Sequence, residues 1–226
     1  MNYEVMGANL WRHAPTLAAM ASETLRFHLS AMEHGNVHRL SDRRSPGDAW
    51  IAQTVDLADR SDADSATPGG GILDRQLDTS NGLVFASDPL TAAVELSGLF
   101  SGRLDLIANK RDLDLTISLY ELTPRGDYMA LSYLIARASF LQDRTRRRLL
   151  TPGRRQQLDF ASGRLTSRRF QAGSRLVVVL AVVKGPAAQI NHGTGKDVSD
   201  ETIADAREPL RLKWFDASYI DVPARR

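Results

Sequence analysis

Cysteine is absent from the 226-residue chain, which excludes disulfide bonds, thiolate metal ligands and cysteine nucleophiles. Long apolar runs are absent too. The longest, Leu176–Val183, has eight residues. A membrane-spanning helix needs about 20, so we expect no membrane partner. The N-terminus has Glu4 and no basic residues ahead of its apolar ones, so it does not resemble a signal peptide, and the compartment stays open.

Helical periodicity is also scarce, and strand-like segments take its place. A hydrophobic content of 42% and a charged content of 25% are ordinary for a globular chain. Leu115, Ile117 and Leu119 alternate with polar residues, as in a half-buried strand. Comparable segments lie at 25–30, 83–87, 92–109, 113–123, 128–140, 154–162, 175–183, 210–215 and 218–222. The spacing predicts an all-β fold, an antiparallel sandwich or jelly roll, with one or two short helices.

Two stretches depart from this pattern. Residues 41–71 contain two Pro–Gly signals, at 46–47 and 68–69, and many short polar residues. We expect them to form a long, loop-rich excursion over the surface. Residues 199–208 are the one helix candidate, and because their N-terminal capping signal is incomplete we expect no more than one or two turns.

Positive charge is concentrated in one part of the chain. Six of the twelve residues 144–155 are arginine, and residues 137–175 hold eleven arginines against two acids, a local charge of about +9 in a chain of net charge +2. Nucleic-acid binding would usually add stacking aromatics or a reading helix beside such a run. The three phenylalanines in this segment lie in strand-like contexts, where burial is expected. We therefore interpret the arginines as decorating a loop and strand edges, solvated or facing another domain, and do not favour nucleic acid as a partner.

Histidines and paired acids give no strong catalytic or metal-binding pattern. His34 and His38 have the i, i+4 spacing of a helical metal site, but Gly35 lies between them and no H-E-x-x-H glutamate is present. We expect a loop pair there, an exposed strand position for His28, and a structural loop around His192, whose GTGK lacks the spacing of a phosphate loop.

The remaining histidine, the acid pairs and the tryptophans receive structural interpretations. We expect His13 to pack in a turn. The pairs Asp112/Asp114 and Asp62/Asp64 do not continue into a calcium-loop pattern, so solvated strand ends are expected. Tryptophans could line a sugar-binding face, although core or interface positions are more usual in a sandwich; they are Trp11, Trp50 and Trp214.

The order of strands and turns resembles a known domain. Residues 87–140, followed by LLTPG (149–153), QQLDF (156–160) and RRFQAGSRLVVVLAVV (168–183), are similar to the C-terminal β-domain of the X-prolyl dipeptidyl-peptidase and cocaine esterase (CocE/NonD) family of α/β serine hydrolases. NYEVMGANLWRHAPTL (2–17) resembles the segment by which that family leaves its hydrolase domain. The closing residues 189–215 match its last strands. Residues 134–140 and 182–190 depart from the family pattern, which puts any substrate-facing role of those loops in doubt.

The resemblance implies an antiparallel jelly-roll sandwich of the galactose-binding-domain-like type, a division of the chain and a role. Residues 1–30 would be the exit strand and linker from an α/β-hydrolase domain, 31–82 a loop-rich connection packing on the sandwich, and 83–226 the jelly roll itself. Its partner would be the hydrolase domain of the same polypeptide, with a homo-oligomer possible. The domain would pack on that partner, cap one side of its pocket and support oligomerisation.

Catalytic residues cannot be carried over from the family. No G-x-S-x-G nucleophile turn occurs; the nearest text, Gly173–Arg175, lacks the second glycine. We expect no catalytic, cofactor-binding or metal-binding residue in this chain, and whether it belongs to an enzyme rests on the parent hydrolase. The alternative is a stand-alone β-sandwich module that binds carbohydrate or a polyanion.

Overall fold

The computed structural model describes residues 1–59, 72–77, 79, 81–185 and 188–226. Strands dominate this part of the chain. They are β1 (Asn2–Val5), β2 (Leu10–His13), β3 (Glu23–His34), β4 (Val37–Ser41), β5 (Trp50–Val55), β6 (Leu73–Asp74), β7 (Gly82–Ala86), β8 (Val94–Gly98), β9 (Ser101–Ala108), β10 (Asp114–Leu122), β11 (Tyr128–Arg137), β12 (Arg155–Ala161), β13 (Thr166–Phe170), β14 (Arg175–Val182), β15 (Leu210–Phe215) and β16 (Tyr219–Arg225). Helix is limited, in the described residues, to the 3-10 turns η1 (Ala18–Met20), η2 (Ala138–Phe140), η3 (Val198–Asp200) and η4 (Ile203–Asp205).

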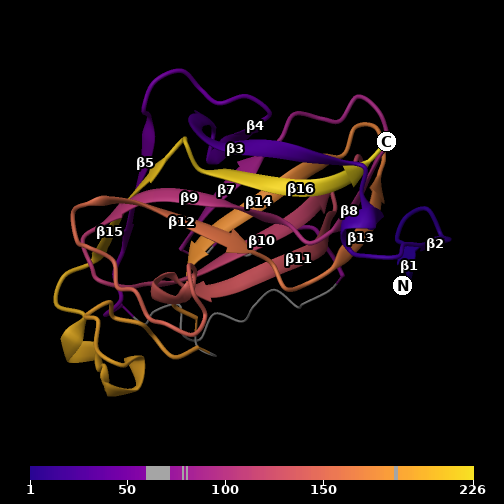
Figure 1. Ribbon diagram of the computed structural model, residues 1–226. Helices are drawn as coiled ribbons and strands as arrows, with labels where there is room; N and C mark the ends of the chain where they lie inside the picture. Colours follow the sequence, from indigo (N-terminus) through magenta and orange to yellow (C-terminus); the bar gives the residue numbers. More distant parts are fainter. Residues whose placement is uncertain (60–71, 78, 80, 186–187) are drawn as a thin grey trace.

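The strands form a sandwich, the all-β jelly roll that the alternation predicts (Figure 1). One layer has the order β4-β7-β14-β10-β11-β6, and the other has β5-β15-β9-β16-β3, with β12 on β9 and the β8–β13 pair beside β16. The long strand β3 joins the layers. Its first half pairs with β16 and its second half with β4, with a register shift between Leu29 and Glu33 that bends it. Pairing is antiparallel except between β4 and β7.

The core lies between the layers and consists of the inward residues of alternating strands. Leu115, Ile117 and Leu119 of β10 are buried, as are Leu104 and Leu106 of β9 across from them. Each fully buried leucine or isoleucine contributes about 1.5–3 kcal/mol relative to exposure. Period-two alternation is therefore what holds the two sheets face to face.

Some expectations for the chain between residues 31 and 82 were wrong. The chain there forms β4, which pairs with β3 and β7, and β5, which pairs with β15, in place of a purely loop-rich excursion. Alternation is present, since Leu40 of β4 and Ile51 and Val55 of β5 are buried, but each strand is only five or six residues long. The glycine-rich run at 67–71 and the pair Asp62/Asp64 lie outside the described residues.

Two other segments differ from expectation, and the helix candidate agrees with it. The segment at 92–109 is two strands, β8 and β9, because Gly98 has a φ of 143° that breaks the ladder. Strand β13 was not anticipated. The helix candidate at 199–208 is two 3-10 turns, the second closed by a capping box between Thr202 and Asp205. No helix in the described residues has the length and apolarity to cross a membrane.

Candidate functional site

The arginines of residues 137–175 are of two kinds, those that pair with enclosed acids and those that do not. Four of its arginines form ion pairs with acids that project from β9, β10 or the turn before β10. The pairs are Arg155 Nε–Asp105 Oδ1 at 2.7 Å, Arg147 Nη2–Asp112 Oδ2 at 3.0 Å, Arg137 Nε–Asp114 Oδ1 at 2.8 Å and Arg168 Nε–Glu121 Oε2 at 2.7 Å. A buried carboxylate is tolerated when a guanidinium and further donors compensate its charge. These four arginine side chains keep 17–35% of their surface exposed, so they lie at the surface as expected, but each is also the ion-pair partner of an acid that is largely or fully buried.

Asp112 is the most enclosed of these acids, with no exposed surface. Its Oδ1 accepts hydrogen bonds from the backbone N–H groups of Leu113 and Ser139, both at 3.0 Å. Its Oδ2 accepts the Ser139 hydroxyl at 2.6 Å and Arg147 Nη2 at 3.0 Å. The expectation of a solvated strand end for the Asp112/Asp114 pair was therefore wrong at Asp112. Ser139 is itself buried and donates to a carboxylate, so it is a structural residue and not a nucleophile.

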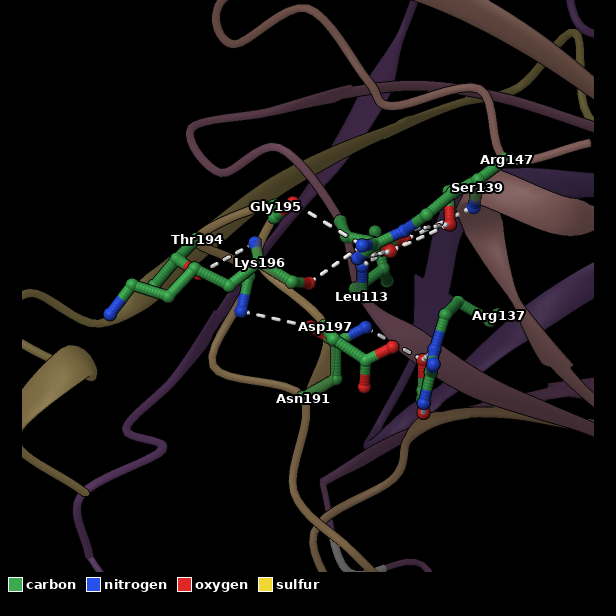
Figure 2. A network of polar contacts seen from close by, with 12 residues as sticks. Leu113, Arg137, Ser139, Arg147, Asn191, Thr194, Gly195, Lys196 and Asp197 are labelled. Carbon is green, nitrogen blue, oxygen red and sulfur yellow. Dashed lines mark hydrogen bonds and ion pairs between the residues drawn. The ribbon is translucent and has the colours of Figure 1, made fainter. Parts of the chain in front are cut away.

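Two of the arginine pairs also hold the chain between residues 191 and 197 (Figure 2). Arg147 Nη1 donates to the carbonyl oxygens of Gly195, at 3.2 Å, and Lys196, at 2.6 Å. Asn191 Nδ2 donates to Asp114 Oδ1 at 2.8 Å, beside the bidentate Arg137. The hydrogen bonds with Asp114 raise the pKa of Arg137. The loop is therefore fixed to the sandwich by charge rather than by apolar packing.

The structure of the same loop shows what its glycines, which the sequence analysis compared with a phosphate-binding loop, do. Gly193 and Gly195 have φ values of 76° and 89°, which turn neighbouring backbone N–H groups toward one point. The N–H groups of His192, at 2.6 Å, and Thr194, at 2.8 Å, both donate to the Glu201 carboxylate, and the Thr194 hydroxyl does the same. The loop is thus an anion-binding nest that an acid of this chain already fills. His192 is buried here and contributes its backbone.

His34 and His38 lie on the two strands of a hairpin instead of in a loop, but they are not opposite each other, because His34 pairs with Val37 and His38 with Glu33. Gly35, with a φ of 65°, makes the turn between β3 and β4. His38 packs on Phe85, with ring centroids 5.3 Å apart, and burial lowers its pKa. Within the described ranges, no three histidine, aspartate or glutamate side chains converge in a metal-binding arrangement.

His28 was expected on an exposed position, and this was wrong. Its Nδ1 is buried, and burial together with the charges of Arg26 and Arg44 lowers its pKa. Nearby lies Asp216, only 1% exposed, whose two carboxylate oxygens have no hydrogen-bond partner among the described residues. Burial raises the pKa of Asp216, against the opposing charges of Arg44, His28 and Arg155.

The N-terminal hairpin is a separate unit at one end of the sandwich. Strands β1 and β2 form their own two-stranded sheet, and Figure 1 places it at the end opposite η3 and η4. Its inner face carries a small apolar cluster made by Tyr3, Val5, Ala14 and Met20. Arg12 Nε donates to the buried Glu95 of β8 at 2.9 Å, and Met6 forms a bridge with Arg168 of β13.

The outer face of the hairpin is different. Trp11 lies there opposite Glu4, and 72% of its surface is exposed. His13 is also on this face, where its Nδ1 contacts Asn2 Oδ1 at 2.8 Å. The three tryptophans do not form one aromatic face. Trp214 is in the core and donates to Gln53 at 2.8 Å, and Trp50 stacks under Lys213 at 4.1 Å. Such an exposed tryptophan on an anchored hairpin is typical of a contact surface.

The main signal that sequence reasoning missed is the set of acids that are enclosed beside arginines, of which Glu121 faces inward. Glu121 follows Leu115, Ile117 and Leu119 at the same period of two, so its inward direction could have been read from the alternation. The pairing of each acid with a particular arginine could not, because the partners lie 23 to 50 residues apart in the chain.

Comparisons with known proteins agree with this architecture. A family model described as the X-Pro dipeptidyl-peptidase C-terminal non-catalytic domain matches residues 1–211. No curated protein matches the chain.

Solved structures show the same fold at low sequence identity. An aminopeptidase from a marine sediment Thaumarchaeota archaeon is 17% identical, with a TM-score of 0.79, over 100% of this chain and 40% of that one. An α-amino acid ester hydrolase is 19% identical, with a TM-score of 0.80, over 99% and 41%. A CocE/NonD family hydrolase from Staphylococcus aureus is 14% identical, with a TM-score of 0.64, over 99% and 40%. The chain therefore spans about two fifths of the length of these proteins.

Proposed function

Because the chain belongs to the family of X-Pro dipeptidyl-peptidase C-terminal non-catalytic domains, we propose that it packs on the catalytic domain of a serine hydrolase within one polypeptide. There it shapes the substrate pocket or the oligomer of the parent enzyme. The observation that carries this proposal is the outer face of the β1–β2 hairpin, where Trp11 is exposed while the inner face is anchored to β8 and β13.

The hairpin has the physical character of a docking element. Its position is fixed, since Arg12 pairs with the buried Glu95 and Met6 bonds to β13, so little ordering entropy is lost on contact. Tryptophan is enriched among the residues that dominate interface energies. Burying Trp11 against a second domain would remove a large apolar side chain from water, a gain of a few kcal/mol.

The chemistry is supplied by the other domain in this proposal. Hydrolysis of an ester or amide by the parent would use a serine nucleophile, a histidine base and an oxyanion hole. In the part of this chain that the structure describes, three buried serines donate to buried acids: Ser139 to Asp112, Ser174 to Glu121 and Ser97 to Glu95. Each is enclosed, and none has a histidine among its hydrogen-bond partners there. The contribution of this domain is therefore shape, support and closure of the pocket.

Replacing Trp11 in the full-length hydrolase tests this role. We expect Trp11→Ser to lower kcat/KM for a p-nitrophenyl ester several-fold and to lower the Tm of the catalytic domain, because a contact between domains is lost. The matched control is Ile203→Ser, since Ile203 is 57% exposed on η4 at the opposite end of the sandwich (Figure 1). Equal effects of the two substitutions, or none from Trp11→Ser, would remove the hairpin as the docking element.

A further inference from the structure

Three exposed arginines are chain neighbours of the ion pair between Asp112 and Arg147. Arg111 precedes Asp112, and Arg146 and Arg148 stand on either side of Arg147. Asp112 is fully buried and Arg147 reaches inward to it, whereas the three flanking arginines are exposed. We call Arg111, Arg146 and Arg148 the arginine surface. The ion pair that fixes Arg147 therefore also fixes the chain from which this surface projects.

Further contacts hold the members of the arginine surface beside one another. The N–H group of Leu150 donates to the carbonyl oxygen of Arg111 at 2.8 Å, which joins the two segments that carry the surface. The N–H group of Arg148 donates to the carbonyl oxygen of Ser139 at 2.7 Å. Arg111 also packs on Gly195, where an added Cβ would lie 3.3 Å from its Nε. Because the backbone under the arginine surface is already fixed, binding would cost little main-chain ordering entropy.

The positive charge of the arginine surface is largely uncompensated. None of its three members forms an ion pair with a carboxylate of the described residues. Two acids of the adjoining loops already have other partners. Asp143 accepts the N–H and the hydroxyl of Thr145, at 2.8 and 2.7 Å, and Asp197 accepts the N–H of Ser199 at 2.9 Å. The surface therefore keeps a net positive charge that an acidic partner can neutralise.

The composition of the loop favours carboxylates over nucleic acid as the partner. Residues 141–154 contain no aromatic side chain on which a base could stack. They add two further exposed arginines, Arg144 and Arg154, which also lack an ion-pair partner in the part of the chain that the structure describes. A guanidinium binds a carboxylate through two parallel N–H···O bonds. Several adjacent guanidinium groups thus match a polypeptide segment with several aspartates or glutamates.

We propose that the arginine surface binds an acidic segment of another polypeptide chain, whose carboxylates pair with Arg111, Arg146 and Arg148. Arg147, which lies between two of these residues, bonds to the chain just ahead of η3, so the surface is at the η3–η4 end of the sandwich. The β1–β2 hairpin is at the opposite end (Figure 1). The inference therefore goes beyond the proposed docking role and stands or fails independently of it.

Fluorescence anisotropy tests the proposal, with the purified chain and a labelled octapeptide that alternates glutamate and serine. We expect binding at about 150 mM NaCl, where exposed charges are largely screened beyond the Debye length. The counterpart peptide with glutamine in place of glutamate should not bind. The triple variant Arg111→Gln, Arg146→Gln and Arg148→Gln should weaken binding of the acidic peptide at least about tenfold, because charge-assisted pairs are lost.

Two further triple variants separate the arginine surface from net charge. The matched control is Arg43→Gln, Arg125→Gln and Arg169→Gln, which removes three arginines that are also exposed and have no ion-pair partner among the described residues. Its affinity should stay within about twofold of the unmodified chain. Lysine at all three positions of the arginine surface should give an intermediate affinity, since lysine keeps the charge but not the planar fork.

Three results would overturn the proposal. The first is no binding of the acidic peptide at about 150 mM NaCl. The second is an equal loss of affinity in the control triple variant, which would show a response to net charge alone. The third is tighter binding of an oligothymidylate with the same number of charges as the peptide, which would identify the loop as a nucleic-acid-binding surface.

Discussion

Several buried carboxylates of this domain are stabilised by an arginine partner. Asp112 has four donors and no exposed surface, and Asp105 and Glu121 are similarly buried beside arginines. Breaking such a pair from one side leaves an uncompensated buried charge, which typically costs 3–5 kcal/mol. The sequence alone indicated a basic run. Which of its arginines pair with enclosed acids depends on contacts with distant strands, and these cannot be read from spacing.

The first test at this scale compares neighbouring arginines. Arg147→Met should lower the free energy of unfolding by about 3 kcal/mol, because Asp112 keeps its Ser139 and Leu113 donors but loses its cation. Arg146→Met should change it by less than about 0.5 kcal/mol, as is usual for an exposed side chain away from such features. Urea unfolding of both variants gives the comparison. Similar losses from the two would mean that the Arg147–Asp112 pair does not stabilise the fold.

Asp216 should make the free energy of unfolding depend on pH in the direction opposite to that of an acid paired with a cation. Burial raises the folded pKa of Asp216 above the ordinary value of an aspartate, 3.8, and this exceeds the opposing effect of Arg44, His28 and Arg155, while Asp48 adds to the increase. The folded state therefore holds this proton more tightly than the unfolded state. The stability that results is present below the unfolded pKa and is lost as the pH rises through the folded pKa.

Asp216→Asn should therefore raise the free energy of unfolding at pH 7, and the gain should shrink toward zero as the pH falls below 3.8. Urea unfolding at a series of pH values measures this difference. Asp42→Asn, at an exposed position, serves as the control and should show a much smaller pH-dependent difference. A loss of stability at pH 7 in the Asp216 variant would contradict the account.

Loops and strands show where sequence patterns succeed and where they stop. Clean alternation in residues 113–123 predicted β10, which buries every second residue, and the continuous apolar run at 176–183 predicted β14, which is buried along most of its length. The short strands β4 and β5 escaped prediction, since few residues in each carry the apolar signal. The edges of the sheets depend on which strands pair, and a short stretch of sequence does not determine that pairing. In the 191–197 loop the glycines were visible in the sequence, but the carboxylate that fills their nest was not.

Removing that carboxylate tests the loop as an element. Glu201→Ala leaves the N–H groups of His192 and Thr194 without their acceptor, which should cost about 1–3 kcal/mol and open the loop locally. Hydrogen exchange at these two amides should become faster, while exchange in the β10 core stays slow. Asp200→Ala, an exposed substitution one residue away, is the matched control. Unchanged exchange at both amides in the Glu201 variant would show that the nest does not hold the loop.

Across the whole molecule, charge and shape point to a domain that works through contacts. A local charge of about +9 within a total of +2 leaves the remaining chain acidic by about seven charges, and four of the basic residues are used internally. The anchored hairpin with the exposed Trp11 is the contact surface that we propose for this role. The family places such a domain beside a hydrolase, and the account assigns the chemistry to that neighbour.

Labelling with a fluorophosphonate probe tests this central claim most directly. The purified 226-residue chain is incubated with the probe, and hydrolysis of a short-chain p-nitrophenyl ester is followed in parallel, with a catalytically competent serine hydrolase as the positive control. The account predicts neither labelling nor turnover by this chain. Stoichiometric labelling of a single serine, accompanied by ester hydrolysis, would contradict it by revealing a nucleophile within the domain itself.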